Sequence, residues 1–255
     1  MSLIQETELG NGIVQLTVDR PKALNALNEE VLNELTQVTE KLAKREDLRV
    51  VILTGAGRAF VAGADIKAML EMSPEGALDF SAKGHAAMSS VAKLPVPVIA
   101  ALNGFALGGG LELALSADLI YASEKAKLGL PEVGLGLVPG FGGTQRLSRL
   151  VGPHVARELV FTGKMIDAQK AKEYGIVLEV FSPDDLLDEV IKIAKTIAAK
   201  GPSAVRSAKK VMYAGIEQPL EDALLSEQRV FQQLFQSEEP RQGMQAHLER
   251  RDPEF

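Results

Sequence analysis

Hydrophobic and polar positions follow two different periods along the first half of the chain. Two alternating runs surround a Gly-Asn-Gly sequence at positions 10–12, a turn that favours positive φ, and they predict a β-hairpin over residues 3–19. After Asn28, apolar residues recur at helical spacing, which predicts a helix over residues 29–44 with Asn28 as its N-cap. Residues 48–57 form a short apolar run, which is typical of a strand buried on both faces.

The same succession of strand, loop and helix then repeats. We expect a helix over residues 74–93, a buried strand over 96–104, a glycine-rich loop, a helix over 110–117 and a strand over 118–123. Such alternation favours an α/β arrangement in which the functional loops gather at one edge of the strands. From about residue 152 the pattern predicts one helix after another. Gly201-Pro202 is the best linker candidate, which divides the chain into a core over residues 1–200 and a helical region over residues 201–255.

Composition narrows the chemistry that the protein can perform. The 255 residues contain no cysteine and only three scattered histidines, so thiolate chemistry and metal sites built on cysteine or histidine are not expected. A net charge of −6 argues against nucleic acid as a partner. No run of about eighteen apolar residues and no export signal are present, so we expect a cytoplasmic protein without membrane contact. Carboxylates, lysine, arginine, hydroxyls and backbone groups remain as the reactive groups.

The stretch ALGGGLELAL, residues 106–115, places three glycines and then Glu112 in an otherwise apolar run. A helix start with a capping glutamate would explain the carboxylate but not the glycines. A glycine cluster between a buried strand and a helix also exposes unpaired N–H groups, which can stabilise a developing oxyanion. The stretch matches neither of the common phosphate-binding glycine motifs.

Two further loops can likewise be interpreted as either structural or catalytic. Glu132 follows Pro131, as at many helix starts, but its neighbours are apolar and would raise its pKa enough to make proton donation feasible. The loop over residues 61–69 reads either as a solvated connection with Asp65 capping a short helix, or as the source of a second backbone donor to an oxyanion.

At these loops the sequence closely resembles the crotonase superfamily and, within it, the short-chain enoyl-CoA hydratases. Six segments carry the resemblance in order: RPKALNAL, AFVAGADIKAM, PVIAALNGFALGGGLELALSADLIYAS, LGLPEVGLGLVPGFGGTQRLSRLVG, ELVFTGKMIDAQKAKEYGIV and RQGMQAHLERRDPEF. The resemblance implies an α/β, crotonase-like spiral of ββα units, followed by a C-terminal helical trimerisation region and assembly into a hexamer built from two trimers. It also implies that Glu112 and Glu132 are catalytic, and that the N–H groups of Ala64 and Gly109 form the oxyanion hole.

The implied reaction is the reversible syn addition of water to a trans-2-enoyl-CoA, which gives a 3-hydroxyacyl-CoA and serves β-oxidation of fatty acids among other pathways. Glu112 would deprotonate water and Glu132 would protonate C2, although coupled carboxylates titrate as a pair. Coenzyme A is part of the substrate, so no separate cofactor or metal is expected. Contacts with the substrate and its coenzyme A would come from Lys22, Ala23, Leu24, Ala62, Asp65, Ile66, Lys67, Gly108 and Arg250, the last in its own or a neighbouring subunit.

Two positions depart from the family pattern. Leu130 stands where hydratases often carry glutamine, and His247 stands where they carry an aromatic residue. Three other functions stay open at this point: another activity of the superfamily, such as a methylglutaconyl-CoA-type hydratase or an enoyl-CoA isomerase; a non-catalytic RNA-binding protein; and a glycosidase, against which the absence of tryptophan speaks. The acyl pocket is expected at Met69, Leu70 and the helix over 74–93, but its length cannot be inferred from the sequence.

Overall fold

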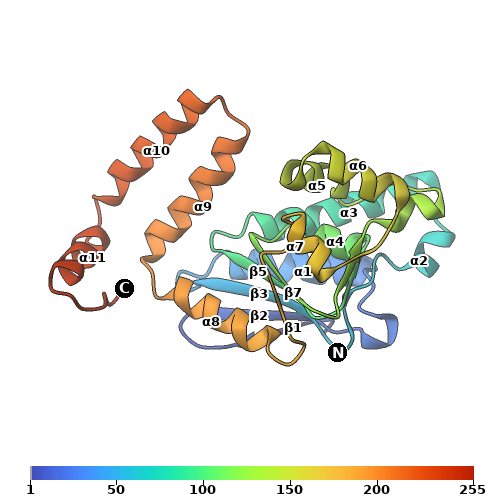
Figure 1. The fold of residues 1–255 in the computed structure, drawn as a ribbon, viewed down its shortest axis with the longest axis horizontal. Helices are drawn as coiled ribbons and strands as arrows, with labels where there is room; N and C mark the ends of the chain where they lie inside the picture. Colours follow the sequence, from blue (N-terminus) through green and yellow to red (C-terminus); the bar gives the residue numbers. More distant parts are fainter. Residues whose placement is uncertain (1) are drawn as a thin grey trace.

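The chain winds into a spiral in which each turn contributes one strand to a large sheet and the next strand to a small one. The computed structural model describes residues 2–255. Three successive turns supply the strand pairs β3 (Val50–Gly55) and β4 (Ala59–Val61), β5 (Val98–Leu102) and β6 (Phe105–Leu107), and β7 (Leu119–Ser123) and β8 (Lys127–Gly129). The expected α/β spiral is therefore present (Figure 1).

The large sheet has the order β1-β2-β3-β5-β7-β10 and is parallel except for its first pair. The predicted hairpin pairs β1 (Ile4–Glu8) with β2 (Ile13–Val18) around Asn11, whose φ of 52° is the left-handed conformation that asparagine tolerates. The far edge is β10 (Glu179–Phe181). The small sheet has the order β4-β6-β8-β9, and its edge strand β9 (Ile166–Asp167) is antiparallel.

Both faces of the large sheet are buried, which explains the unbroken apolar run at β3. Val51 and Leu53 point into the main core with α1 (Glu29–Leu42) and α3 (Pro74–Ala92), whereas Val50 and Ile52 pack on the other face against α8 (Leu186–Ala198). The helix predicted at residue 29 begins there, because the Asn28 side chain accepts the N–H of Val31.

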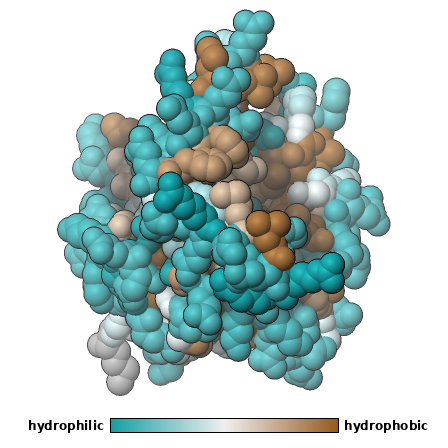
Figure 2. Space-filling model, turned by 90° about the vertical axis from the view of Figure 1, so that its left-hand side faces the viewer, coloured by the Kyte–Doolittle hydropathy of each residue, from teal (hydrophilic) through white to brown (hydrophobic). Residues whose placement is uncertain are grey.

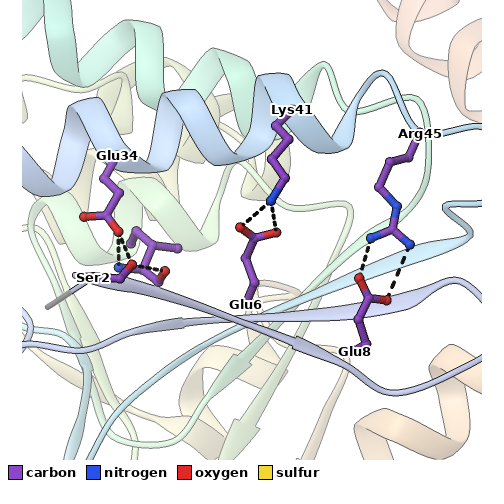
Figure 3. A network of polar contacts seen from close by, with 7 residues as sticks. Ser2, Glu6, Glu8, Glu34, Lys41 and Arg45 are labelled. Atoms are coloured by element: carbon purple, nitrogen blue, oxygen red, sulfur yellow. Dashed lines mark hydrogen bonds and ion pairs between the residues drawn. The ribbon is translucent and has the colours of Figure 1, made fainter.

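Polar contacts tie α1 and the turn after it to the exposed edge strand β1 (Figure 3). Glu34 accepts the N–H groups of Leu3 and Ile4. Farther along, Lys41 pairs with Glu6 at 2.9 Å, and Arg45 pairs with Glu8. Side chains two residues apart on a strand share one face, as do side chains four residues apart on a helix. Glu6 and Glu8 therefore face Lys41 and Arg45 in the same order. The contacts cover an edge that could otherwise pair with another strand.

The shorter elements lie around the small sheet and at the chain reversals. They are η1 (Pro21–Ala23), α2 (Ile66–Leu70), α4 (Gly109–Ala114), η2 (Pro131–Leu135), α5 (Gly143–Val151), α6 (Pro153–Thr162) and α7 (Ala168–Glu173). Among residues 2–255, no helix combines the length and the low polarity that crossing a bilayer requires.

The last three helices extend away from the rest of the molecule, at the left of Figure 1. They are α9 (Pro202–Ile216), α10 (Leu220–Leu234) and α11 (Glu239–Leu248), and we call them the helical extension. At its root, Lys209 pairs with Asp118 at 2.7 Å and also donates to the carbonyl of Val96. Hydrophobic side chains interrupt the polar surface of this end of the molecule (Figure 2). The large exposed ones on these helices are Met212, Tyr213, Ile216, Leu220, Leu224, Leu225, Phe231, Met244 and Leu248.

The expectation of one helix after another from about residue 152 is wrong at two places, because the strands β9 and β10 interrupt the helices. The helices also start before this point, since α5 begins at Gly143. Strands of two or three residues are too short to show a period, and Gly142 provides no side-chain cap to mark the start of α5. The chain does break between α8 and α9 at Gly201, but the division into two domains stays a prediction.

Candidate active site

The three loops that the sequence singled out follow three neighbouring parallel strands of the small sheet. Strand β6 pairs in parallel with β4 on one side and with β8 on the other. The carboxyl ends of parallel strands meet at one edge, so the loop with Ala64, the glycine loop that leads into Glu112, and the loop with Glu132 converge there. The structure therefore gathers residues that lie 68 positions apart in the chain.

Close contacts explain two of the three glycines before Glu112. Gly108 has φ +52° and ψ −124°, a backbone region open essentially to glycine alone, and a methyl group there would lie 2.9 Å from Oε1 of Glu132. A methyl group at Gly110 would lie 1.9 Å from the carbonyl oxygen of Val61. The absence of side chains lets α4 pack directly on β4 and lets the backbone approach Glu132.

The N–H group of Ala64 points away from its neighbouring chain segment. Ala64 forms an isolated parallel bridge with Leu27, in which Leu27 donates to Gly63 at 2.9 Å and Asp65 donates to Leu27 at 2.8 Å. Because the flanking residues make both bonds, the N–H of Ala64 faces the other side. Within residues 2–255 this N–H donates to no backbone carbonyl.

Gly109 supplies a comparable group at the next strand end. It is the first residue of α4, where the N–H has no partner within the helix, and among the described residues it donates to no other backbone carbonyl. The helix dipole adds a partial positive charge at this end. Both N–H groups are thus free to bind negative charge that develops on a ligand.

Glu112 is held in one orientation inside the protein. Its side chain is 1% exposed, and Oε1 accepts the N–H groups of Phe141 at 2.8 Å and Gly143 at 2.7 Å. Burial raises the pKa of Glu112, while these two N–H groups and the charge of Arg146 act in the opposite direction. No residue in the described part of the chain donates to Oε2, which leaves that oxygen for a ligand or water.

Glu132 has fewer hydrogen-bond partners than Glu112 among the described residues. Its Oε2 is buried and has no hydrogen-bond partner among residues 2–255. Burial first, and the negative charge of Glu112 second, raise the pKa of Glu132 to about 7. This is the direction that apolar surroundings predict. A carboxyl with this pKa is protonated in a large fraction of molecules near neutral pH, so it can donate a proton.

The loop over residues 20–25 lies against the start of the first active-site loop. Leu24 and Asn25 have φ values of 51° and 60°, and Leu24 accepts the N–H of Ala62 at 3.0 Å. The buried side-chain amide of Asn25 donates to three carbonyls of the β3–β4 region, those of Ala56, Ala59 and Phe60. This hydrogen bonding fixes the exposed Lys22 and the half-buried Ala23 beside the site.

Asp65 does not cap α2 with its side chain. Instead, its carboxylate pairs with the guanidinium of Arg20 at 3.3 Å, which joins the two loops. The next residues, Ile66 and Lys67, are exposed on α2. Of the expected coenzyme A contacts, only Arg250 is far away, because it follows α11 at the opposite end of the molecule from α2 (Figure 1).

Both departures from the family pattern have clear locations. Leu130 is fully buried, and its Cδ1 would lie 3.1 Å from a methyl group at Gly143, so it packs beside the loop that holds Glu112. His247 is exposed on α11.

Sequence reasoning missed the segment that holds Glu112. Phe141 and Gly143 bond the carboxylate through their backbones, and Arg146 donates from Nη1 to the carbonyl of Phe141 at 2.8 Å. The glycines in PGFGG were the available signal. Among residues 2–255, no group of three or more His, Asp or Glu side chains is placed to hold a metal ion.

Comparison with known proteins agrees with this geometry. Residues 8–255 match the family described as "Enoyl-CoA hydratase/isomerase", and the chain belongs to this family. It is 43% identical over 252 residues to the "Short-chain-enoyl-CoA hydratase" of Clostridium acetobutylicum, covering 96% of this chain and 97% of that protein. It is 44% identical over 241 residues to the "Crotonyl-CoA hydratase" of Syntrophomonas wolfei, covering 94% and 93%.

A solved structure extends the agreement to the whole fold. The crystal structure of an enoyl-CoA hydratase from Bacillus anthracis superposes with a TM-score of 0.97 at 41% identity, covering 100% of this chain and 99% of that one. The family and the crotonase-like fold indicated by the sequence are confirmed, and the chain is an enzyme of this family.

Proposed function

We propose that this protein is an enoyl-CoA hydratase, which adds water reversibly and with syn geometry to trans-2-enoyl-CoA to give 3-hydroxyacyl-CoA. The convergence of the buried Glu112 and the half-buried Glu132, both with a raised pKa, with two free backbone N–H groups carries the proposal. Relatives named for this activity, at 43% and 44% identity across nearly the whole chain, support it.

The proposed mechanism assigns each group one task. Glu112, ionised, accepts a proton from water as the water oxygen bonds to C3 of the substrate. The electrons of the double bond shift toward the thioester, whose oxygen is stabilised by the N–H groups of Ala64 and Gly109. Glu132 then gives its proton to C2. Glu112 ends protonated and Glu132 ionised, and proton exchange restores the starting state before the next turnover.

The presence of both carboxyls favours hydration over double-bond isomerisation. Moving a double bond requires one group that removes and returns a proton, whereas adding water requires a base for water and an acid for carbon. Glu112 has Oε2 free and Oε1 fixed by two N–H groups, which suits a carboxylate that holds water.

Coenzyme A would enter as part of the substrate, without a further cofactor. Its nucleotide would lie along the loop of Lys22, Ala23 and Leu24. Asp65, Ile66 and Lys67 would line the path of its adenine and pantetheine, and Ala62 and Gly108 would also contact the substrate. Asn25 and the Arg20–Asp65 pair support this path, because they fix the two loops that form it.

Arg250 could reach the phosphates only from another copy of the chain, since it lies far from the site of its own chain. We therefore propose a homo-oligomer, a hexamer built from two trimers. The exposed hydrophobic side chains of the helical extension support it, because such surfaces are usually covered by a partner. Light scattering after size-exclusion chromatography tests the state directly. A monomer at micromolar concentration would contradict it.

The test of the function uses the ultraviolet absorbance of the conjugated enoyl thioester. With crotonyl-CoA the absorbance should fall, and Glu112→Gln and Glu132→Gln should each lower the rate by about 10²- to 10⁴-fold. Glu158→Gln, at an exposed glutamate on α6, is the matched control and should keep full activity. Folded wild-type protein that leaves every enoyl thioester unchanged would overturn the proposal, as would full activity in either active-site variant. Salt-sensitive RNA retention by inactive protein would favour the RNA-binding alternative.

A further inference from the structure

Arg146 lies directly against the backbone of the loop that holds Glu112. Its Nη1 donates to the carbonyl of Phe141 at 2.8 Å, and a methyl group at Gly142 would lie 2.3 Å from the same nitrogen. The φ of +106° at Gly142 is a second reason for glycine at this position. The bare backbone of the loop thus leaves room for the guanidinium.

This contact reaches Glu112 through a single peptide group. Burial raises the pKa of Glu112, and the N–H of Gly142 is one of the groups that act in the opposite direction. The same peptide group contains the carbonyl of Phe141, to which Arg146 donates. A cation at the carbonyl polarises the peptide group and makes its N–H a better donor. Arg146 therefore favours the ionised form of Glu112 both by its own charge and through the loop.

One face of α9 packs against the core through polar side chains that lie four positions apart. These side chains are Lys209, Tyr213 and Glu217. Lys209 pairs with Asp118, just before β7, at 2.7 Å. Glu217, directly after α9, pairs with Arg149 on α5 at 3.3 Å. Because Arg149 follows Arg146 by one helical turn, this contact brings α9 beside Arg146.

Tyr213 lies between the two ion pairs. The ammonium of Lys209 stands 5.6 Å from the centroid of its ring. Burial raises the pKa of Tyr213, Asp118 raises it further by its charge and by a hydrogen bond, and Arg146 acts in the opposite direction. Burial likewise lowers the pKa of Arg146, whereas Glu112 and then Tyr213 raise it. The phenol oxygen and the guanidinium are therefore close enough to act on each other.

We propose that Arg146 is a positioning residue for Glu112, and that Tyr213 makes this positioning depend on the packing of α9 in the same chain. The inference rests on the proposed function, in which Glu112 accepts a proton from water. With α9 in place, Tyr213 keeps the guanidinium at the carbonyl of Phe141, and the loop keeps its N–H groups on the carboxylate. The helical extension thereby contributes to the reaction without touching the substrate.

The experiment measures kcat and the pH dependence of kcat/KM with crotonyl-CoA in three variants. Arg146→Gln should lower kcat by about 10- to 100-fold, because the carboxylate is no longer held in place. The acidic limb of its pH profile should move to higher pH, since the cation that favours ionised Glu112 is gone. Arg146→Lys keeps the charge and should keep the position of this limb. Tyr213→Phe loses one hydroxyl and should lower kcat by about 3- to 10-fold.

Matched controls change the same residue types outside this contact. Arg157→Gln, at an exposed arginine on α6, and Tyr174→Phe, at a half-buried tyrosine after α7, should keep the wild-type kcat and pH profile. Two other titratable groups face the loop or its carboxylate. They are Glu132 and His85 of α3, whose Cε1 would lie 3.6 Å from a methyl group at Gly142. Both are unchanged in every variant, so a difference between the profiles reports on Arg146.

Hydrogen exchange provides a readout that needs no turnover. The N–H groups of Phe141 and Gly143 should exchange faster in Arg146→Gln and Tyr213→Phe than in wild type, because the loop that presents them is loosened. If wild type hydrates no enoyl thioester, the proposed function fails, while faster exchange of these two groups in both variants still identifies the link.

Three results would overturn the inference. The first is Arg146→Gln with the wild-type kcat. The second is a loss of kcat in Arg146→Gln without any movement of the acidic limb, which a purely structural role would produce. The third is Tyr213→Phe that matches wild type both in kcat and in the exchange of the loop.

Discussion

The carboxylate of Glu132 lies against the Cα of Gly108, so close that a methyl group on the glycine would stand 2.9 Å from Oε1. The glycine also has the positive φ that side chains avoid. The two residues come from neighbouring turns of the spiral. Their contact makes the position of the proposed proton donor depend on the absence of a side chain at residue 108.

Gly108→Ala should therefore impair both stability and activity. The backbone strain should lower the free energy of unfolding by about 1–3 kcal/mol, and the displaced Glu132 should lower kcat with crotonyl-CoA. Gly134→Ala is the matched control, because Gly134 has open space around it and no positive φ. Denaturant unfolding and steady-state kinetics measure the two effects. An alanine at 108 with wild-type kcat would show that Glu132 need not be held there.

Replacing Glu112 in two ways separates chemistry from folding. Glu112→Gln keeps an oxygen that can accept the N–H groups of Phe141 and Gly143, so it should fold normally while losing activity. Glu112→Ala leaves two buried N–H groups without a partner, which should cost about 1–3 kcal/mol of stability for each group. Thermal and urea unfolding would reveal the difference. Equal stability of the two variants would mean that the loop rearranges to satisfy its N–H groups elsewhere.

The pKa of Glu132, about 7, predicts the pH dependence of the reaction. One proton shared by the carboxyl pair is required, so kcat/KM should fall about tenfold per pH unit once the pH exceeds this pKa. Hydration involves no net proton uptake, so dehydration of 3-hydroxybutanoyl-CoA must show the same profile. The two profiles are measured with a stopped-flow or standard spectrophotometer. A flat profile between pH 6 and 9 would contradict the assignment.

The same raised pKa predicts that Glu132 lowers stability in alkaline solution. Its folded pKa of about 7 lies above the usual 4.5, so between these values the folded protein holds a proton that the unfolded chain releases. The free energy of unfolding should thus decrease as the pH rises through this window. Glu132→Gln removes the effect and should be more stable than wild type at pH 8 but not at pH 4. Melting temperatures at the two pH values test the sign.

Asn25 should matter for binding rather than for chemistry. Asn25→Ala removes the amide that donates to Ala56, Ala59 and Phe60, so the loop with Lys22 should loosen and KM for crotonyl-CoA should rise more than kcat falls. Asn103→Ala, which removes another asparagine amide that bonds this same region, is a useful comparison. A selective loss of kcat in Asn25→Ala would point to a role in the reaction itself.

The sequence revealed the parts of the site that have local signatures. Three glycines before a carboxylate, and a glutamate after proline among apolar residues, stood out for an energetic reason. Ordering glycine costs conformational entropy, and placing a carboxylate among apolar groups costs solvation free energy. The strands β4, β6, β8 and β9 of the small sheet were not predicted, since two or three residues carry no readable period. Yet this sheet is what brings Ala64, Gly109 and Glu132 together.

The segment around Phe141 shows a second limit. Its contribution to Glu112 comes from backbone N–H groups, which every residue except proline possesses, so no side-chain pattern could announce it. Arg146 was overlooked for the opposite reason, because an arginine on an amphipathic helix normally faces solvent. Its bond to the carbonyl of Phe141 and its charge near Glu112 distinguish it.

The spiral has a consequence for how the protein can vary. Each of the three turns contributes one strand to each sheet and, at the end of its second strand, one loop of the candidate active site. Deleting a turn would therefore remove one of the three loops of the candidate active site together with one strand of each sheet. We do not expect an active variant that lacks a whole turn. Exchanging the few residues at the strand ends leaves the windings intact, and new reactions could arise there without a new architecture.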